Sequence, residues 1–368
     1  MRLPLQGGLP PAAAMAGAVV EIACDESGFS GSNLLDPATP VITHGSVDLS
    51  VDEAYALIAT LRSGFRCSPN EFKSGQFLRS ATAAEALEWF LAALGGRAHV
   101  HLVDKEYFLV TRIVDLLLAE PTYAAGTRLT LDHRPAALAL YRAGRSAGCD
   151  WAVFLATFVK MVRLKRRHRP DQQVFERFFE AREALVRDGL GTPAEEVLGA
   201  LSRARVWAVL TRLSDNDRSI PPPLEPMLPA LAETVLFWSG GHRQVLVIHD
   251  EQSALTAGRL RRLQQTLADG PGSLRAVPDA SPAGADEDAV SPTGADLAGV
   301  STAGANQAAA LAARFSPLAG LVTVDSRDDP RVQVADLLAG MARRLPGTVD
   351  DGPLQPFVSP TSLRDRQG

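Results

Sequence analysis

The sequence predicts an α/β protein: a parallel or mixed sheet flanked by helices, with a large and mainly helical segment between two parts of the sheet. Short, almost unbroken apolar runs such as "VVEIACD" and "VLVIHD" are typical of strands buried on both faces. Longer stretches whose apolar residues recur at helical spacing separate these runs. From about residue 105 to residue 240, the pattern is almost wholly helical.

Length and composition agree with one large or two ordinary globular domains, since 46% of the 368 residues are hydrophobic. The formal net charge of −5 does not predict tight, non-specific binding to nucleic acid, although local basic patches are compatible with it. Cys24, Cys67 and Cys149 lie far apart and form no C-x-x-C pair, and the start of the chain lacks the apolar run of an export signal. We therefore expect free thiols in a reducing cytoplasm. We expect no membrane span, because no apolar run reaches about 18 residues.

The first part of the chain predicts three strands and two helices. Ser50 and Glu53 match the capping box of the first helix, and Gly95 and Gly96 end the second. The order is strand, strand, helix, helix, strand, over residues 18–28, 40–49, 50–64, 80–96 and 97–105.

Helices dominate the remainder, with two further strands near the end. Six helices are predicted over residues 106–120, 134–148, 150–169, 171–189, 192–213 and 226–241. A strand, a helix, a strand and a last helix follow, over residues 243–251, 253–270, 318–326 and 330–345. Pro330 stands near the first position of the last helix, where its missing N–H costs little.

A ten-residue motif rich in Ala, Gly, Ser and Pro occurs three times in residues 281–310. It contains almost no large apolar residue, so it cannot bury enough surface to offset the entropy of ordering, and we predict a disordered insert. The predicted division of the chain is a flexible N-terminal extension at 1–17, a sheet core at 18–104, a helical insertion at 105–240, a second part of the core at 241–270 and 318–346, the disordered repeat insert at 271–317, and a flexible tail at 347–368.

Four predicted strands end on an aspartate: Asp25, Asp104, Asp250 and Asp325. Because sites in α/β sheets form at the carboxyl ends of strands, these carboxylates are candidates for one cluster. Gathered carboxylates raise each other's pKa unless cations neutralise them, and Mg²⁺ or Mn²⁺ prefers such oxygen ligands. Two such ions about 3.5–4 Å apart would clamp the oxygens of a phosphodiester. The alternative is that aspartate simply favours turns after strands, and Asp325 in "DSRDDP" fits that alternative best.

The last helix adds a polar pair to an otherwise apolar pattern. Gln333 and Asp336 are three residues apart and fall on one side of the helix, together with Gly340. An aspartate among core residues is costly unless a cation or a donor satisfies it. This pattern indicates a fifth candidate ligand, Asp336, although the solvent-facing side of an amphipathic helix would look the same.

The segments "CDESGFSG", "EFKSG", "VDK", "HDEQS" and "VDSR…VQVADLLAG" resemble a bacterial family catalogued as domain of unknown function 3800, over roughly residues 18 to 345 apart from the repeat. That family is placed among RNase H-like folds. The resemblance implies an RNase H-like mixed sheet with a large helical insertion, and one antiparallel group formed by the first three strands. Only two strands precede the first helix here, which leaves a third to be found near "RCSPNEFKS".

The resemblance also implies a metal site. RNase H-like nucleases place carboxylates on the first strand, a central strand and the last helix, which by position are Asp25, Asp104 and Asp336, with Asp250 the alternative on a central strand. Residues at other motif positions have supporting roles by the same resemblance: Glu26, Glu71, Lys73, Lys105, Glu251 and Gln333. Lys73, in a short motif without core periodicity, is a candidate catalytic cation that would hold the scissile phosphate or assist the leaving group.

A basic run ends the predicted helix at 150–169 and is a candidate contact for a phosphate backbone: Lys160, Arg163, Lys165, Arg166 and Arg167. Cations are also favoured at a helix C-terminus by the dipole, which explains the run equally well. His99 and His101 alternate on one strand face, but no third ligand with zinc spacing is visible, so core histidines are the favoured interpretation.

The sequence contains no phosphate loop, dinucleotide fingerprint, H-E-x-x-H motif or G-x-S-x-G elbow, which excludes the corresponding enzyme classes. The leading hypothesis is a nuclease or phosphodiesterase that depends on Mg²⁺ or Mn²⁺ and acts on DNA or RNA. The alternative is a non-catalytic binding or regulatory module of the same fold, which uses the acidic pocket for a partner or a nucleotide.

Overall fold

The computed structural model describes residues 8–10, 19–29, 33–65, 83–163, 169–270, 316–345 and 347–365. Five strands form one mixed sheet in the order β3-β2-β1-β4-β5. They are β1 (Val19–Ser27), β2 (Val41–Val47), β3 (Ala98–Asp104), β4 (Gln244–Asp250) and β5 (Leu318–Val324). Strand β2 is antiparallel to both β1 and β3, whereas β4 is parallel to β1 and β5 is parallel to β4. Strands β1, β3, β4 and β5 therefore all end at the same edge of the sheet.

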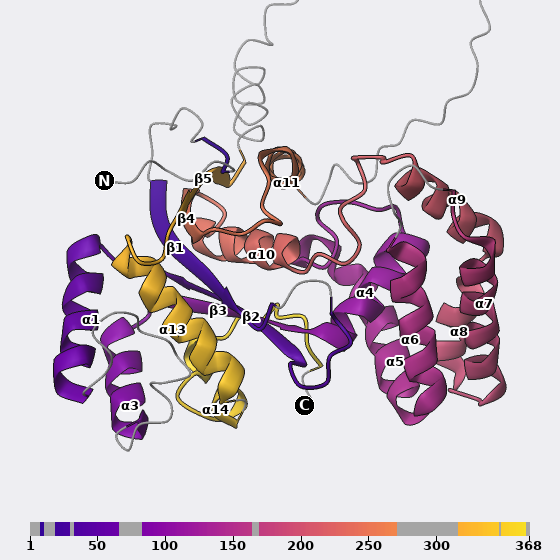
Figure 1. Ribbon diagram of the computed structural model, residues 1–368, viewed down its shortest axis with the longest axis horizontal. Coiled ribbons are helices and arrows are strands. Elements are labelled where there is room, and N and C mark those ends of the chain that lie inside the picture. The colour runs from indigo at the N-terminus through magenta and orange to yellow at the C-terminus, as the bar shows by residue number, and fades with distance from the viewer. Residues whose placement is uncertain are drawn as a thin grey trace, which may run out of the picture.

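The helices fall into three groups (Figure 1). One face of the sheet carries α1 (Val51–Phe65), α3 (Ala83–Leu94) and α13 (Pro330–Arg344), and the other carries α10 (Met227–Ser239) and α11 (Ala257–Asp269). The remaining long helices gather beside one end of the sheet: α4 (Lys105–Leu117), α5 (Arg134–Ser146), α6 (Cys149–Val162), α7 (Gln172–Arg187), α8 (Thr192–Ala200) and α9 (Arg203–Ser214).

Two cores lie on the two faces because side chains alternate along each strand. On β1, Ile22 and Cys24 belong to the larger core, which extends through α10 and the helices α4 to α9. Ala23 belongs to the smaller core, with α1, α3 and α13. Asp25 follows this alternation, so its side chain lies on the face that α13 covers.

Helix α13 approaches β2 very closely at Gly45. A Cβ atom at this position would lie 2.7 Å from the carbonyl oxygen of Ala335 and 3.1 Å from the backbone nitrogen of Ala339. The Thr43 hydroxyl donates to the Ala339 carbonyl at 2.7 Å and fixes the contact. Glycine in the strand and alanines in the helix thus bring the backbone of α13 down to the sheet.

Several local predictions are confirmed. Ser50 and Glu53 form the reciprocal capping box of α1, with Ser50 N to Glu53 Oε2 at 2.8 Å and Glu53 N to Ser50 Oγ at 3.3 Å. Pro330 begins α13, which Asp329 caps through the backbone nitrogen of Arg331. The single helix predicted over 192–213 is wrong, because Leu201 leaves the helical conformation and Ser202 caps a new helix, α9.

The C-terminal segment differs most from expectation. We predicted a flexible tail at 347–368, but α14 (Gly347–Asp350) and η3 (Gln355–Phe357) lead into an extended segment that runs beside β3. The backbone nitrogen of Ser359 donates to Val100 O at 2.7 Å, and that of Leu363 donates to Leu102 O at 2.8 Å. Leu363 is fully buried. Backbone hydrogen bonds and this apolar anchor therefore hold the segment against β3.

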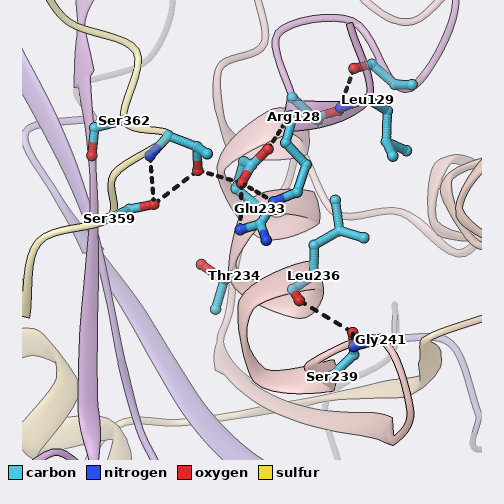
Figure 2. Close-up of polar contacts among 12 residues, drawn as sticks. Arg128, Leu129, Glu233, Thr234, Leu236, Ser239, Gly241, Ser359 and Ser362 are labelled. Atoms are coloured by element: carbon cyan, nitrogen blue, oxygen red, sulfur yellow. Dashed lines mark hydrogen bonds and ion pairs between the residues drawn. The ribbon is translucent and has the colours of Figure 1, made fainter. Parts of the chain in front are cut away.

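A buried carboxylate also fastens this segment (Figure 2). Glu233 on α10 has no exposed surface and accepts from Arg128 Nε at 3.0 Å and from the hydroxyl of Thr361. Ser359 lies 2.9 Å from the Thr361 hydroxyl, oxygen to oxygen, and extends the network (Figure 2). No sequence pattern indicated this network, which joins α10 to the segment beside β3.

The predicted disordered repeat insert and the N-terminal extension lie outside the described residues, apart from Gly8 to Pro10 and a few positions at their borders. The stretch in which a third strand was sought, "RCSPNEFKS", lies outside them as well. The third antiparallel strand is β3, which follows two helices. In the described ranges, every helix is too short or too polar to cross a membrane.

Candidate functional site: a carboxylate cluster at the strand ends

Asp25 lies at the centre of the candidate site. It is only 6% exposed, near the end of the middle strand and beneath α13. Its Oδ1 accepts from the backbone nitrogen of Glu26 at 2.7 Å. Burial raises the pKa of Asp25 well above its usual range, and the nearby charges of Glu26, Asp336 and Asp250 raise it further.

Asp250 is the strand neighbour of Asp25. The parallel register pairs Cys24 with His249, so the next residues of the two strands, Asp25 and Asp250, lie side by side. Asp250 Oδ1 accepts from the backbone nitrogen of Ser326 at 3.1 Å, which ties the end of β4 to the turn that follows β5.

Asp336 reaches the same cluster from α13. Together with Gln333, it interrupts a helix whose residues from Val332 to Ala342 are otherwise buried, as the sequence predicted. Gln333 stabilises the turn after β5. Its Nε2 donates to Ser326 O at 2.9 Å, and its Oε1 accepts from Arg62 at 3.5 Å. Gln333 and Asp250 therefore hold the same turn and position α13 over the strand ends.

Glu26 borders the cluster and is partly buried. One of its oxygens accepts from Gln252 Nε2, while Oε2 has no hydrogen-bond partner among the described residues. Burial raises the pKa of Glu26 to about 7, with a further contribution from Asp250 and an opposing one from the Gln252 hydrogen bond. Gln252, in the "HDEQS" segment, was missed because a lone glutamine carries no distinctive sequence signal.

Asp104 lies apart from this cluster. Strand β2 separates β3 from β1, and Asp104 pairs with Val41 at the start of β2. Its carboxylate caps α4 by accepting from Tyr107 N at 2.8 Å, and it also accepts from the Tyr141 hydroxyl at 3.2 Å. Burial raises the pKa of Asp104, and Glu106 rather than a member of the cluster is the carboxylate that raises it further. Of the two alternatives for a central-strand ligand, Asp250 and not Asp104 is therefore the residue beside Asp25.

The other predicted site residues are dispersed or not described. Asp325 forms an ion pair with Arg327 at 2.6 Å, which supports the turn interpretation, and Glu251 is exposed. Lys160 and Arg163 are exposed at the end of α6, in the helical group beside the sheet. Five predicted residues lie outside the described part of the chain: Glu71, Lys73, Lys165, Arg166 and Arg167.

The fit to a metal ion is mixed. As placed, no group of three or more His, Cys, Asp or Glu side chains in the described ranges could hold a metal. However, Mg²⁺ keeps several waters and is bound by one or two protein carboxylates in many sites. Asp25 with Asp250 or Asp336 supplies such a pair, and their mutual repulsion is the property that a divalent cation would relieve.

Two buried histidines, His44 and His249, form a hydrogen-bonded chain from α10 to the end of β4. His249 Nδ1 lies 2.9 Å from the Asp250 carbonyl oxygen, so this nitrogen carries the proton. His249 Nε2 then accepts from His44 Nε2 at 3.2 Å, and His44 Nδ1 accepts from the Thr234 hydroxyl at 2.9 Å. Burial lowers the pKa of both rings, so this chain of neutral groups links α10 to the backbone of Asp250.

His99 and His101 are core residues, the interpretation favoured from sequence. Both are buried, and all four of their ring nitrogens lack hydrogen-bond partners among the described residues. The His99 ring stacks on Phe237 with 4.0 Å between centroids. Burial lowers the pKa of His99 to about 3, with a smaller contribution from the charge of Arg128.

Replacing His99 by phenylalanine is expected to stabilise the fold, because it removes two desolvated polar atoms and keeps the stacked ring. The gain should be about 1 kcal/mol at pH 8. Below pH 6.5 the unfolded histidine binds a proton that the folded one does not, so the stability of the wild type falls as pH decreases towards 3. The gain from His99→Phe should therefore grow by about 2 kcal/mol between pH 8 and pH 5.

Urea unfolding at pH 8 and pH 5 measures both effects. His242→Phe is the control, because His242 is an exposed histidine. An equal gain for His99→Phe at the two pH values would contradict the assignment of a neutral, buried His99.

No family model, curated protein or solved structure matches the chain.

Proposed function

We propose that the protein is an RNase H-like, divalent-metal-dependent nuclease or phosphodiesterase whose site is the cluster of Asp25, Asp250 and Asp336. The observation that carries this proposal is the placement of Asp25. It is a buried carboxylate at the C-terminal edge of the middle strand, and its charged neighbours are two aspartates and a glutamate. Such a cluster is unfavourable unless protons or cations neutralise it.

The strand order supports the RNase H-like part of the proposal. Strands β1, β2 and β3 form one antiparallel group, and β4 and β5 then extend the sheet in parallel. This agrees with the arrangement that the sequence resemblance implies. The helices α4 to α9, which separate β3 from β4, correspond in this proposal to an inserted helical unit that would help to hold a nucleic acid substrate.

The proposed site combines metal-binding carboxylates with residues that position them. Asp25 and either Asp250 or Asp336 would bind Mg²⁺ or Mn²⁺, which when bound supplies an activated water and stabilises negative charge. Ser326 and Gln333 hold the turn and the helix in position for Asp250 and Asp336. The buried α13 excludes bulk water from one side, and Glu26 Oε2 is the carboxyl oxygen there that is available to hold a proton.

One observation favours the alternative, a non-catalytic module that binds a partner or a nucleotide at the same pocket. No three described side chains converge as metal ligands. In this alternative, bound protons instead of a metal ion neutralise the carboxylates. The pocket then recognises a cationic or hydrogen-bonding group.

Calorimetric titration with Mn²⁺ distinguishes the two functions. The wild type is expected to bind at millimolar concentration or below, and Asp336→Asn is expected to bind at least tenfold more weakly because one carboxylate is lost. Asp325→Asn is the matched control, since Asp325 also ends a strand but pairs with Arg327. Incubation with single-stranded, double-stranded and branched DNA and with RNA then identifies the substrate. No Mn²⁺ binding by the wild type would exclude the nuclease and leave the binding module.

A further inference from the structure

Two cations, Lys105 and Arg343, form no ion pair with a carboxylate in the described part of the chain. Lys105 is only 2% exposed, and Arg343 is partly buried near the end of α13. In the described ranges, neither side chain has a carboxylate oxygen within 4.0 Å. A buried cation without an anion close by is costly, so this pair needs an explanation.

Each cation is instead fixed by a hydroxyl. Lys105 Nζ donates to Thr39 Oγ1 at 2.9 Å, and Arg343 Nε donates to Ser27 Oγ at 2.9 Å. Thr39 in turn donates to Asp36 at 3.0 Å, which is the nearest acidic influence on Lys105. Each contact uses one N–H donor, one from the Lys105 ammonium and one from the Arg343 guanidinium. Both groups have further N–H donors.

The two side chains meet at the start of β2. The backbone nitrogen of Lys105 donates to Pro40 O at 2.9 Å, which fixes Lys105 beside Val41. A Cβ at Gly28 would lie 2.5 Å from Val41 O and 2.6 Å from Arg343 Cδ, so Arg343 crosses the chain at the same place. Burial lowers the pKa of Lys105, the charge of Asp36 raises it, and the charge of Arg343 lowers it.

Ser27 and Arg343 lie beyond Asp25 and Asp336 along β1 and α13. Ser27 follows Asp25 by two residues on the same face of β1, a step of about 7 Å. Arg343 follows Asp336 by seven residues, two turns further along the same side of α13, and Asp336 is the acidic group that acts on its pKa. The cations therefore stand at one end of the carboxylates, where a chain of phosphates that reaches the cluster would pass.

We propose that Lys105 and Arg343, with the hydroxyls of Thr39 and Ser27, form a phosphate-binding site adjacent to the carboxylate cluster. Its ligand is a phosphodiester of a nucleic acid strand, next to the one that lies at the carboxylates. This proposal rests on the proposed function for its substrate, but phosphate binding at the site does not require a metal. Arginine supplies a planar set of donors and lysine a compact charge, a combination suited to phosphate oxygens.

Titration with inorganic phosphate and with a short oligonucleotide, both in EDTA, tests the site without the metal. The wild type is expected to bind both ligands, and Lys105→Met and Arg343→Met should each weaken binding tenfold or more. Arg344→Met is the matched control, because Arg344 is the adjacent but exposed arginine of α13. Lys105→Met should also raise the melting temperature of the protein without phosphate, because an unpaired buried charge is removed, and phosphate should no longer raise it further.

The outcomes separate this proposal from the proposed function. Equal phosphate affinity in the wild type and both Met variants, or none in the wild type, would overturn the phosphate site even if Mn²⁺ binds. Phosphate binding that depends on both cations, without any Mn²⁺ binding, would retain the site and reject the nuclease. If Arg343→Met does not fold, Arg343→Lys keeps the charge but loses the Nε donor to Ser27, and an intermediate phosphate affinity is expected.

Discussion

Replacing Asp25 by asparagine is expected to lower metal-dependent cleavage by about 10²–10³-fold and, in metal-free buffer, to stabilise the fold. The two effects have one cause. The carboxylate is buried among like charges. It can therefore bind a cation, but without one its charge lowers the stability of the fold. Asparagine keeps the shape and removes the charge. A functional residue that lowers stability in this way is typical of an active site.

The pH dependence gives the sign of the stability effect. Because the pKa of Asp25 is higher in the folded than in the unfolded protein, the folded state holds an extra proton between the two values. Wild-type stability therefore falls as pH rises from about 4 through the folded pKa, and Asp25→Asn lacks this loss. The gain should be near zero at pH 4 and about 1–2 kcal/mol at pH 8.

Urea unfolding in EDTA at pH 4, 6 and 8 measures the gain, with Asp325→Asn as the control. Addition of Mn²⁺ should reverse the order at pH 8, since only the wild type gains from binding. A variant less stable than the wild type at pH 8 without metal would show that Asp25 is a structural group and not a strained ligand.

Replacing Gly45 by alanine should destabilise the protein by about 2–3 kcal/mol, although only one methyl group is added. The new Cβ would lie 2.7 Å from a backbone carbonyl oxygen of α13, which cannot rotate away. Relief requires the helix to move off the sheet, and this helix carries Asp336. Mn²⁺ affinity should therefore fall together with stability.

Gly64→Ala provides a control of opposite sign. Gly64 lies in α1, and nothing lies within 4 Å of a Cβ at that position. Alanine is favoured over glycine in a helix, so Gly64→Ala should stabilise the fold by up to about 1 kcal/mol. Chemical denaturation of the three proteins checks both signs, and a neutral Gly45→Ala would mean that α13 can shift without cost.

Periodicity and capping predicted most elements of the fold, because these signals are local. Almost unbroken apolar runs located the strands, and the capping box located the start of α1. The polar pair in α13 was also visible, since Gln333 and Asp336 interrupt a core pattern. These features depend on neighbours within one or two turns.

Strand order, by contrast, is not a local property. Asp104 and Asp250 end similar apolar runs, and only the insertion of antiparallel β2 between β3 and β1 separates Asp104 from Asp25. The histidine pair His44 and His249 likewise forms only when two distant strands and α10 assemble. No local pattern marks Arg343, because its contact with Ser27 joins positions 316 residues apart.

The segment beside β3 can cover the edge of that strand only late in synthesis. Residues 98–104 leave the ribosome early, but the hydrogen bonds of Ser359 and Leu363 to that strand cannot form until the chain has been made as far as Leu363. At ~10 residues per second, this interval is about half a minute. During it, the nascent protein carries an open strand edge of the kind that pairs with other chains. Residues 358–363 therefore cover this edge late in synthesis, and a chain truncated before them would leave it open.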